Sequence, residues 1–236
     1  MVFVKQSIHI INLDARIKAV KTKWKISAED KKDLIRFLRD LEIGKVNKGI
    51  KISEARQLKY LDMLKIPLEH FNKPVPQLTP KDTENFEKAL ISNKILSWKK
   101  KPLSNWTKVD IKTILKVYLK WKLGDTQQYK NLTEFFDTRI KQATPEYLSE
   151  AEAEKLFKAC KTAKERFLVA VLFDSGSRAE EFFNIRKEDI QLPTNNENYV
   201  KLTLKEEYSK TKGIVISLYW KHSLDAVRDY LREREI

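Results

Sequence analysis

The chain has 236 residues, of which 42% are hydrophobic and 34% charged, with a net charge of +14. This balance excludes a disordered chain and allows one large domain or two small ones. Its single cysteine, Cys160, excludes an internal disulfide, and the three histidines stand too far apart to suggest a metal site, so we expect no metal and no cofactor. No apolar run approaches the roughly 18 residues that cross a membrane, and the first residues lack a secretory signal, so we expect a cytoplasmic protein that binds no membrane.

Helical spacing of apolar residues dominates the first part of the chain. The spacing predicts helices at 8–22, 28–42, 52–71, 80–92 and 106–123, and a short helical piece around 132–140 within a linker. Ser27 with Asp30 marks the start of the second helix, and Thr79 followed by Pro80 marks the start of the fourth. Pro67 is a candidate interruption of the third helix.

The second part of the chain mixes helices with strands. After a domain boundary at Thr144-Pro145, the pattern predicts helices at 151–163, 166–173, 179–186 and 223–234, and two strands at 199–205 and 214–219 that are joined by a hairpin loop. Ser149 and Glu152 form a capping box before the first of these helices. The predicted fold class is mainly α with a small β-hairpin or sheet, in two domains that span residues 1–143 and 144–236.

The positive charge is distributed unevenly. Residues 1–143 hold 31 Lys and Arg against 16 Asp and Glu, whereas residues 144–236 hold 16 against 17, so the whole surplus lies in the first domain. A basic domain beside a neutral one favours a module that grips a polyanion such as nucleic acid. The alternative is a lysine-rich solvated surface with no such partner.

One arginine stands at a sharp turn between two helices of the second domain. Gly176 ends the first helix, Arg178 follows, and Glu180 and Glu181 begin the second helix. An arginine near the amino end of a helix favours binding of an anion such as phosphate. The alternative is a plain helix corner in which Arg178 forms a salt bridge with Glu181.

The order of parts resembles that of the tyrosine recombinases, the phage-integrase family, in their archaeal or phage forms. The arginine corner matches the family's first catalytic arginine motif through Gly176, Arg178, Glu181, Phe182, Phe183, Ile185, Asp189 and Ile190. Residues 208–213 resemble the hairpin that carries the family's catalytic lysine, residues 147–156 resemble the opening of its catalytic domain, and residues 52–60 and 103–108 resemble two helix starts in its DNA-binding domain.

The resemblance implies a helical core-binding domain of SAM-like fold over residues 1–143, followed by the first part of an α+β catalytic domain over 144–236. It implies site-specific DNA recombination or integration, with double-stranded DNA as partner, a tetramer on DNA for the full-length protein, and a monomer for this fragment. Arg178 and Lys210 would be catalytic, with Lys212 as the rival hairpin lysine, and Glu181 would steady Arg178. Candidate DNA contacts, each weighed against plain surface charge, are Arg56, Lys59, Lys99, Lys100, Lys101 and Lys108.

The sequence also departs from the family. The family requires a His-x-x-Arg motif and, after it, a nucleophilic tyrosine; Tyr230 precedes any such motif, so we do not expect it to be the nucleophile. We therefore expect the N-terminal two-thirds of a recombinase, inactive in cleavage by itself. One alternative is a DNA-binding-only truncated integrase that acts as a competitor or regulator. Another is an unrelated helical protein that binds RNA or DNA and has a coincidental arginine corner.

Overall fold

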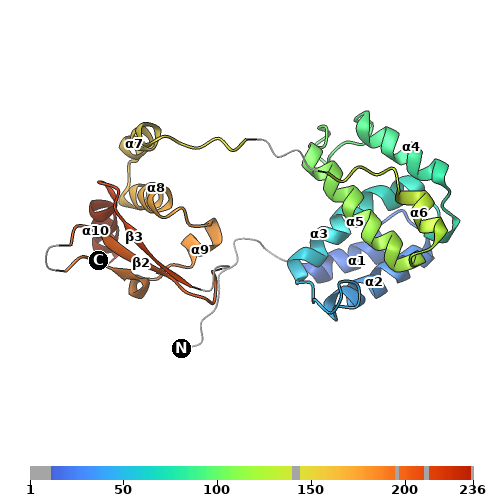
Figure 1. Cartoon of the computed structure of the whole chain (residues 1–236), viewed down its shortest axis with the longest axis horizontal. Helices are drawn as coiled ribbons and strands as arrows, with labels where there is room; N and C mark the ends of the chain where they lie inside the picture. Colours follow the sequence, from blue (N-terminus) through green and yellow to red (C-terminus); the bar gives the residue numbers. More distant parts are fainter. Residues whose placement is uncertain (1–11, 140–143, 195–196, 210–212, 235–236) are drawn as a thin grey trace. The chain divides into compact units, whose positions relative to one another are not determined.

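The computed structural model describes residues 12–139, 144–194, 197–209 and 213–234 of the chain. These residues form two compact units, which lie within 12–139 and 144–234 (Figure 1). The described chain is mostly helical and contains a three-stranded antiparallel sheet. The predicted fold class, mainly α with a small sheet, is therefore confirmed. No helix among the described residues is both long and apolar enough to cross a membrane.

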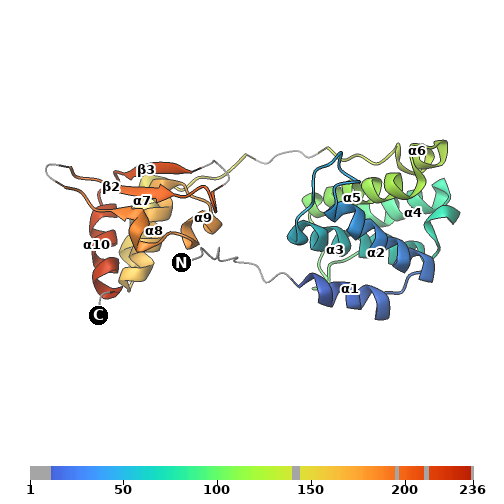
Figure 2. The same cartoon turned by 90° about the horizontal axis from the view of Figure 1, so that it is seen from below.

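The first unit, which we call the helical unit, is built from helices among its described residues, apart from an isolated β-bridge between Leu96 and Pro102 (Figure 2). Its elements are α1 (Leu13–Thr22), α2 (Ala28–Glu42), α3 (Glu54–Phe71), the 3₁₀ turn η1 (Val75–Gln77), α4 (Pro80–Ile91), α5 (Asn105–Leu123) and α6 (Gln127–Thr133). α3 packs along α5, and the apolar faces of the helices meet in one core. Fully buried large side chains of this core include Phe37, Leu61, Leu64, Phe86, Leu115 and Tyr118.

Local capping explains where the helices of this unit begin. The Ser27 hydroxyl accepts the Asp30 backbone N–H at 3.0 Å, and Thr79 is the N-cap of α4 with Pro80 as its first residue, so both predicted start signals are confirmed. The Thr79 backbone N–H also donates to the Asp82 carboxylate at 2.8 Å, which was not predicted. The Asn12 side chain accepts the Ala15 N–H at 2.9 Å, and α1 therefore begins at Leu13; residues 8–11 of the predicted first helix lie outside the described residues.

Two expectations for the helical unit are wrong. Pro67 does not interrupt α3, which continues to Phe71 with the proline buried inside it. The short helix lies at Gln127–Thr133 rather than around 132–140, because the Thr126 hydroxyl accepts the Tyr129 N–H at 3.3 Å and starts the helix there. Of the apolar residues that suggested the later position, Leu132 is buried against the core near the end of this earlier helix.

The second unit, which we call the mixed unit, packs helices against the sheet. Its elements are α7 (Glu150–Ala159), α8 (Ala163–Ser175), α9 (Ala179–Phe183), the 3₁₀ turn η2 (Lys187–Asp189), β1 (Ile190–Gln191), β2 (Val200–Leu204), β3 (Ile214–Leu218) and α10 (Ser223–Arg234). The sheet order is β1-β2-β3, and Leu202 pairs with both Ile190 and Ile216. Alternate residues of β2 are buried, which matches the period of two that predicted a strand. α8 packs against α10 and β3.

The boundaries predicted for the mixed unit need three corrections. The helix predicted at 151–163 ends at Ala159, and α8 begins at Ala163, because Thr162 and Glu165 form a capping box between them. The helix predicted at 179–186 ends at Phe183, since the chain must turn there to reach the sheet. The third strand, β1, was not predicted: a strand of two residues is too short to show a period.

Candidate functional site

The arginine corner lies between α8 and α9. Gly176 ends α8 in the left-handed conformation, with φ 59° and ψ 17°, and its N–H donates to the Leu172 carbonyl at 3.1 Å. A side chain at Gly176 would meet no atom within 4 Å, so the backbone angle and not space accounts for glycine here. Ser175 and Ser177 bridge the turn through a hydroxyl–hydroxyl hydrogen bond of 2.9 Å. Together these features fix the direction in which the chain enters α9.

Glu181 organises this corner from a buried position. Its side chain is only 4% exposed and accepts the backbone N–H of Arg178 at 2.9 Å and the Arg178 Nη1 at 3.0 Å. The same carboxylate accepts the Ser209 hydroxyl at 3.2 Å. A buried carboxylate is stable only when such donors surround it. Glu181 therefore joins the arginine corner to the segment that leads out of β2.

The backbone N–H and one guanidinium nitrogen of Arg178 are bound to Glu181, while much of its side chain is exposed to solvent. Its side chain is 56% exposed, although Nη1 is bound to Glu181. A guanidinium carries five N–H donors, so one bond to a carboxylate leaves donors that can face an anion. The salt-bridged corner and the anion-binding corner, which the sequence presents as alternatives, are thus compatible in one geometry. α9 has only five residues, so the charge of Arg178, and not the helix end, would attract the anion.

The base of the β2–β3 hairpin lies beside the same corner. Lys210 and Lys212, the two candidate hairpin lysines, lie outside the described residues. Ser209, which directly precedes Lys210, is bound to Glu181 as stated above. Gly213, which directly follows Lys212, has φ 77°, so the chain re-enters β3 through a conformation that favours glycine. Ser209, the last described residue before the two lysines, therefore contacts the same carboxylate as Arg178.

A second buried carboxylate, Asp189, fixes the other end of the arginine motif. Asp189 accepts the Arg186 backbone N–H at 3.0 Å and lies 3.3 Å from the Tyr208 hydroxyl. Lys205 Nζ lies 2.7 Å from its carboxylate, and this hydrogen bond raises the pKa of Lys205. Burial raises the pKa of the Tyr208 hydroxyl. These contacts hold the segment after α9 against β2.

The roles of Ser209, Tyr208 and Asp189 were not predicted from the sequence. All three hold the corner and the hairpin together, as described above. The matched motif includes Asp189 but does not show its partner, which lies on another strand. The available signal was the pattern of polar residues at 205–209 between two strands, which is also typical of an ordinary solvated turn.

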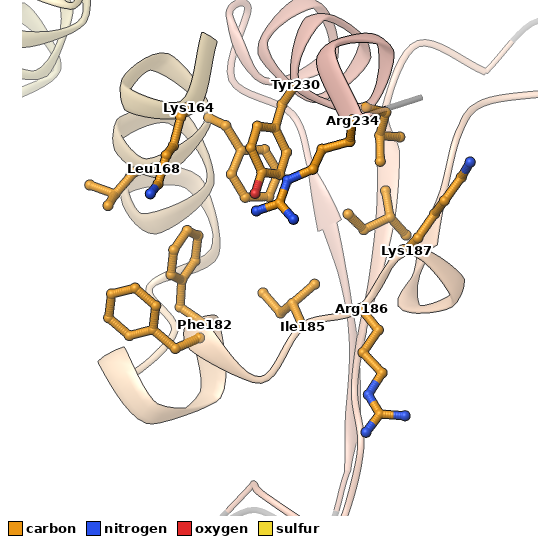
Figure 3. A pocket seen from close by; sticks show the side chains of 12 residues that line it. Lys164, Leu168, Phe182, Ile185, Arg186, Lys187, Tyr230 and Arg234 are labelled. Atoms are coloured by element: carbon orange, nitrogen blue, oxygen red, sulfur yellow. The ribbon is translucent and has the colours of Figure 1, made fainter. Parts of the chain in front are cut away.

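Tyr230 lines a pocket of the mixed unit that has a volume of about 430 Å³ (Figure 3). It stacks on Phe167 with ring centroids 4.3 Å apart, and Arg234 lies 5.3 Å from the centre of its ring. The pocket is lined by apolar residues with a basic edge, and Arg178 is not among its lining residues. Tyr230 and Arg178 thus do not share this pocket.

The candidate DNA contacts of the helical unit occupy three elements. Arg56 and Lys59 are exposed on α3, but Lys59 Nζ pairs with Asp110 at 2.7 Å. Lys108, in the first turn of α5, donates to the Asn93 side chain at 2.8 Å. Lys99, Lys100 and Lys101 are exposed on the turn between α4 and α5. Lys59 and Lys108 therefore have intramolecular partners that a phosphate would have to replace or share.

No charged cluster in the described chain has the composition of a metal site. Groups of three or more His, Cys, Asp or Glu that could hold a metal ion are absent from the described residues. The described groups at the arginine corner are one guanidinium, one buried carboxylate and three serine hydroxyl groups.

Comparisons with known proteins give little beyond the fold. No protein-family profile matches the chain, and no curated protein matches it. Among solved structures, the crystal structure of XerA recombinase is similar to it with a TM-score of 0.34 and 21% sequence identity, over 87% of this chain and 65% of that chain. The chain thus spans about 65% of the length of that recombinase. A TM-score at this level carries no functional weight.

Proposed function

We propose that this protein acts in site-specific recombination of DNA by the chemistry of tyrosine recombinases, with Arg178 as a donor to the scissile phosphate. The observation that carries the proposal is the double role of Glu181, which binds both Arg178 and Ser209. Through it, an exposed arginine and Ser209, the residue directly before Lys210, are held next to each other. An arginine together with a second cation would suit a transition state with negative charge on phosphoryl oxygens.

The proposed step divides the work between the two cations. A tyrosine hydroxyl loses its proton to solvent and attacks phosphorus, the bond from phosphorus to the 5′ oxygen breaks, and a covalent 3′-phosphotyrosine forms. Arg178 would stabilise the charge on the phosphoryl oxygens, because a guanidinium is always protonated and presents planar donors. The ammonium of Lys210, or of its rival Lys212, would give its proton to the departing 5′ oxygen. Glu181 would hold Arg178 in position and take no part in proton transfer.

The helical unit would supply affinity for the DNA duplex. Residues 1–143 carry 31 basic against 16 acidic residues, and they would form the core-binding domain, with residues 144–236 as the N-terminal part of the catalytic domain. Lys99, Lys100 and Lys101 are the strongest candidates for phosphate contacts, because they are exposed together on one hydrogen-bonded turn. Lysine–phosphate contacts release counterions and depend on salt concentration.

A second candidate function is DNA binding without strand cleavage, as a competitor or regulator of an intact integrase. The observation in its favour is that the whole positive surplus lies in residues 1–143, whereas Arg178 lies in the other unit. Binding by the helical unit would not require the arginine corner.

Two measurements test the proposal. The first is the affinity of the chain for duplex DNA as a function of salt: we expect the logarithm of the affinity to fall linearly, and a K99Q/K100Q/K101Q variant to reduce the slope by about 2.7. A K155Q/K158Q/K161Q variant in the neutral half is the matched control and should leave the slope unchanged. A flat salt dependence of the wild type would contradict DNA binding.

The second measurement separates recombination from binding alone. It uses the protein produced from the full reading frame of its gene and follows covalent protein–DNA adducts on nicked duplexes. We expect R178A to reduce adduct formation roughly a hundredfold or more, with duplex affinity changed far less. R178K, which keeps the charge but loses the planar donors, should form adducts at a level between those of R178A and wild type. Equal cleavage by R178A and wild type would contradict the role of Arg178, and absence of any adduct would favour the DNA-binding-only function.

A further inference from the structure

A tryptophan projects into solvent at the turn between α4 and α5. Trp98 is 88% exposed, although burial of a tryptophan side chain is among the larger apolar contributions to stability. The turn is nevertheless well defined. Leu96 and Pro102 form an antiparallel bridge, the Ser97 N–H donates to the Lys101 carbonyl at 2.8 Å, and the Lys100 N–H donates to the Ser97 carbonyl at 2.8 Å. Trp98 is therefore exposed on a turn whose backbone is closed by its own hydrogen bonds.

The backbone of this turn presents its side chains outward. Lys100 has φ 56°, a left-handed conformation that is uncommon for a residue with a side chain. The Lys101 N–H also donates to the Ser97 hydroxyl at 3.2 Å, which closes the turn from within. Hydrogen bonds within the turn hold its backbone, so the side chains at its tip are not required to pack against the protein. Trp98, Lys99, Lys100 and Lys101, which we call the tryptophan turn, are all exposed.

The charges around Trp98 indicate the kind of partner. Lys99 Nζ lies 4.9 Å from the centre of the Trp98 ring, so a cation already covers one part of the aromatic system. Three consecutive lysines favour a polyanion, and an exposed aromatic ring favours a flat apolar surface. Nucleic acid offers both, because phosphates flank the faces of its bases. In an intact duplex, however, the base faces are covered by stacking, so a tryptophan can reach one only where the duplex is opened or kinked.

We propose that the tryptophan turn binds DNA at an opened or kinked step, with Trp98 stacked on an exposed nucleobase and Lys99–Lys101 against the adjacent phosphates. This inference rests on the proposed function in so far as the helical unit binds DNA, and it adds a role that the lysines alone do not have. The lysines give affinity for any duplex, whereas Trp98 selects duplexes with an accessible base.

The experiment compares two DNA probes with the whole chain. One probe is an intact duplex, and the other is the same duplex with a two-nucleotide gap that leaves 2-aminopurine unpaired. We expect W98A to weaken binding to the gapped duplex roughly tenfold, because stacking on one base contributes on this scale. Binding to the intact duplex should change less than about twofold. Wild type should quench 2-aminopurine fluorescence, and W98A should not.

Two further variants make the result specific. W98F keeps an aromatic ring and should retain most of the preference for the gapped duplex. I50A removes another exposed apolar side chain of the helical unit, which is 64% exposed, and should leave both affinities unchanged. Equal losses by W98A on the two probes, or no loss on either, would overturn the inference while leaving DNA binding intact. Absence of wild-type binding to the intact duplex would contradict the proposed function itself.

A membrane surface is the competing partner that this experiment must exclude. Exposed tryptophan beside lysine also suits the interface of an anionic bilayer. Wild type should therefore bind vesicles of phosphatidylserine and phosphatidylcholine no better than W98A does. Tighter binding of wild type to such vesicles than to gapped DNA would overturn the inference.

Discussion

The two units of this protein differ in how their candidate DNA-binding groups are held. In the helical unit the core is formed mainly by large apolar and aromatic side chains, although Asp30 is also buried there and accepts the Val75 N–H at 3.3 Å, and the candidate lysines Lys99–Lys101 are exposed on the surface. In the mixed unit, buried carboxylates connect segments that are distant in sequence: Glu181 reaches Ser209, and Asp189 reaches Lys205. Asp174 similarly accepts the Trp220 N–H at 2.7 Å and thereby joins the end of α8 to the start of α10.

The two arrangements suit different tasks: exposed lysines provide affinity for a polyanion, whereas a buried carboxylate fixes the position of one arginine. A surface rich in lysine attracts a polyanion wherever it touches, and small movements of the lysines cost little because their side chains are flexible and solvated. A single arginine that must meet one phosphate needs a fixed origin, which a buried carboxylate with several donors supplies. The comparison therefore predicts that single substitutions around Glu181 act strongly and locally, whereas single substitutions of exposed charges in the helical unit act weakly.

The largest effect should follow from removal of the buried carboxylate at the corner. Glu181→Ala leaves the Arg178 backbone N–H and the Ser209 hydroxyl without this acceptor, and we expect a loss of about 3 kcal/mol in the free energy of unfolding of the mixed unit. Hydrogen exchange with mass spectrometry would measure this loss in peptides of α8 and β2. Peptides of α3 and α5, in the helical unit, should be unchanged.

Two variants control the interpretation of Glu181→Ala. Glu181→Gln keeps a carbonyl acceptor and should recover part of the stability. Glu188→Gln removes a carboxylate that is 59% exposed in the same segment and should change stability by less than about 0.5 kcal/mol. If Glu181→Ala altered exchange no more than Glu188→Gln, the carboxylate would not organise the corner.

A smaller effect, with opposite signs in the two units, should follow from removal of one tyrosine hydroxyl in each. The Tyr208 hydroxyl lies 3.3 Å from Asp189 Oδ2 and 3.2 Å from the Thr203 carbonyl, so Tyr208→Phe should cost about 1–2 kcal/mol. The Tyr118 hydroxyl is buried and has no hydrogen-bond partner among the described residues. Burial raises its pKa, and its removal in Tyr118→Phe should be neutral or should stabilise the helical unit by up to about 1 kcal/mol.

Hydrogen exchange of peptides from each unit, followed as a function of urea concentration, would measure the change in unfolding free energy for both tyrosine variants. The difference in sign is the informative result, since the two substitutions remove the same atom from buried rings. Destabilisation of similar size in both units would mean that Tyr118 has a partner in the native protein, and the contrast between an apolar core and a bonded network would then weaken.

The sequence predicts much of the helical unit because its signals are local. The start signals are Ser27 with Asp30 three positions on and Thr79 followed directly by Pro80, and both mark the observed helix starts. The misplaced helix near 132–140 shows the limit, because the apolar spacing continued past the residue at which Thr126 starts the real helix. Pro67 shows another limit: the helix passes through the proline because its flanks are buried, and burial outweighs local propensity.

The sequence predicts the members of the candidate site but not how they are joined. Gly176, Arg178 and Glu181 stand within six positions of one another, so their association is visible as a motif. The bond from Ser209 to Glu181 spans 28 residues and depends on how β2 is placed against α9, which no local pattern encodes. β1 was missed for the same reason, since its two residues become a strand only by pairing with Lys201 and Leu202.

The smallest effect should come from a surface carboxylate of the helical unit, and it tests whether charge there acts as weakly as the comparison requires. Burial alone would raise the pKa of Asp82, but hydrogen bonds from Lys73 and Thr79 outweigh it and lower the pKa to about 2. A carboxyl whose pKa is lower in the folded state stabilises the fold above its unfolded pKa and loses this contribution as pH falls through the folded value. We therefore expect Asp82→Asn to cost about 1 kcal/mol at pH 6 and progressively less between about pH 4 and pH 2.

Hydrogen exchange in α4 at pH 6 and pH 2.5 would measure this cost, with Glu84→Gln on the same helix as control. A cost for Asp82→Asn that stayed constant down to pH 2.5 would assign the whole effect to side-chain shape and none to charge, whereas a cost above about 3 kcal/mol would show that positioning by carboxylates is as strong in the helical unit as in the mixed one.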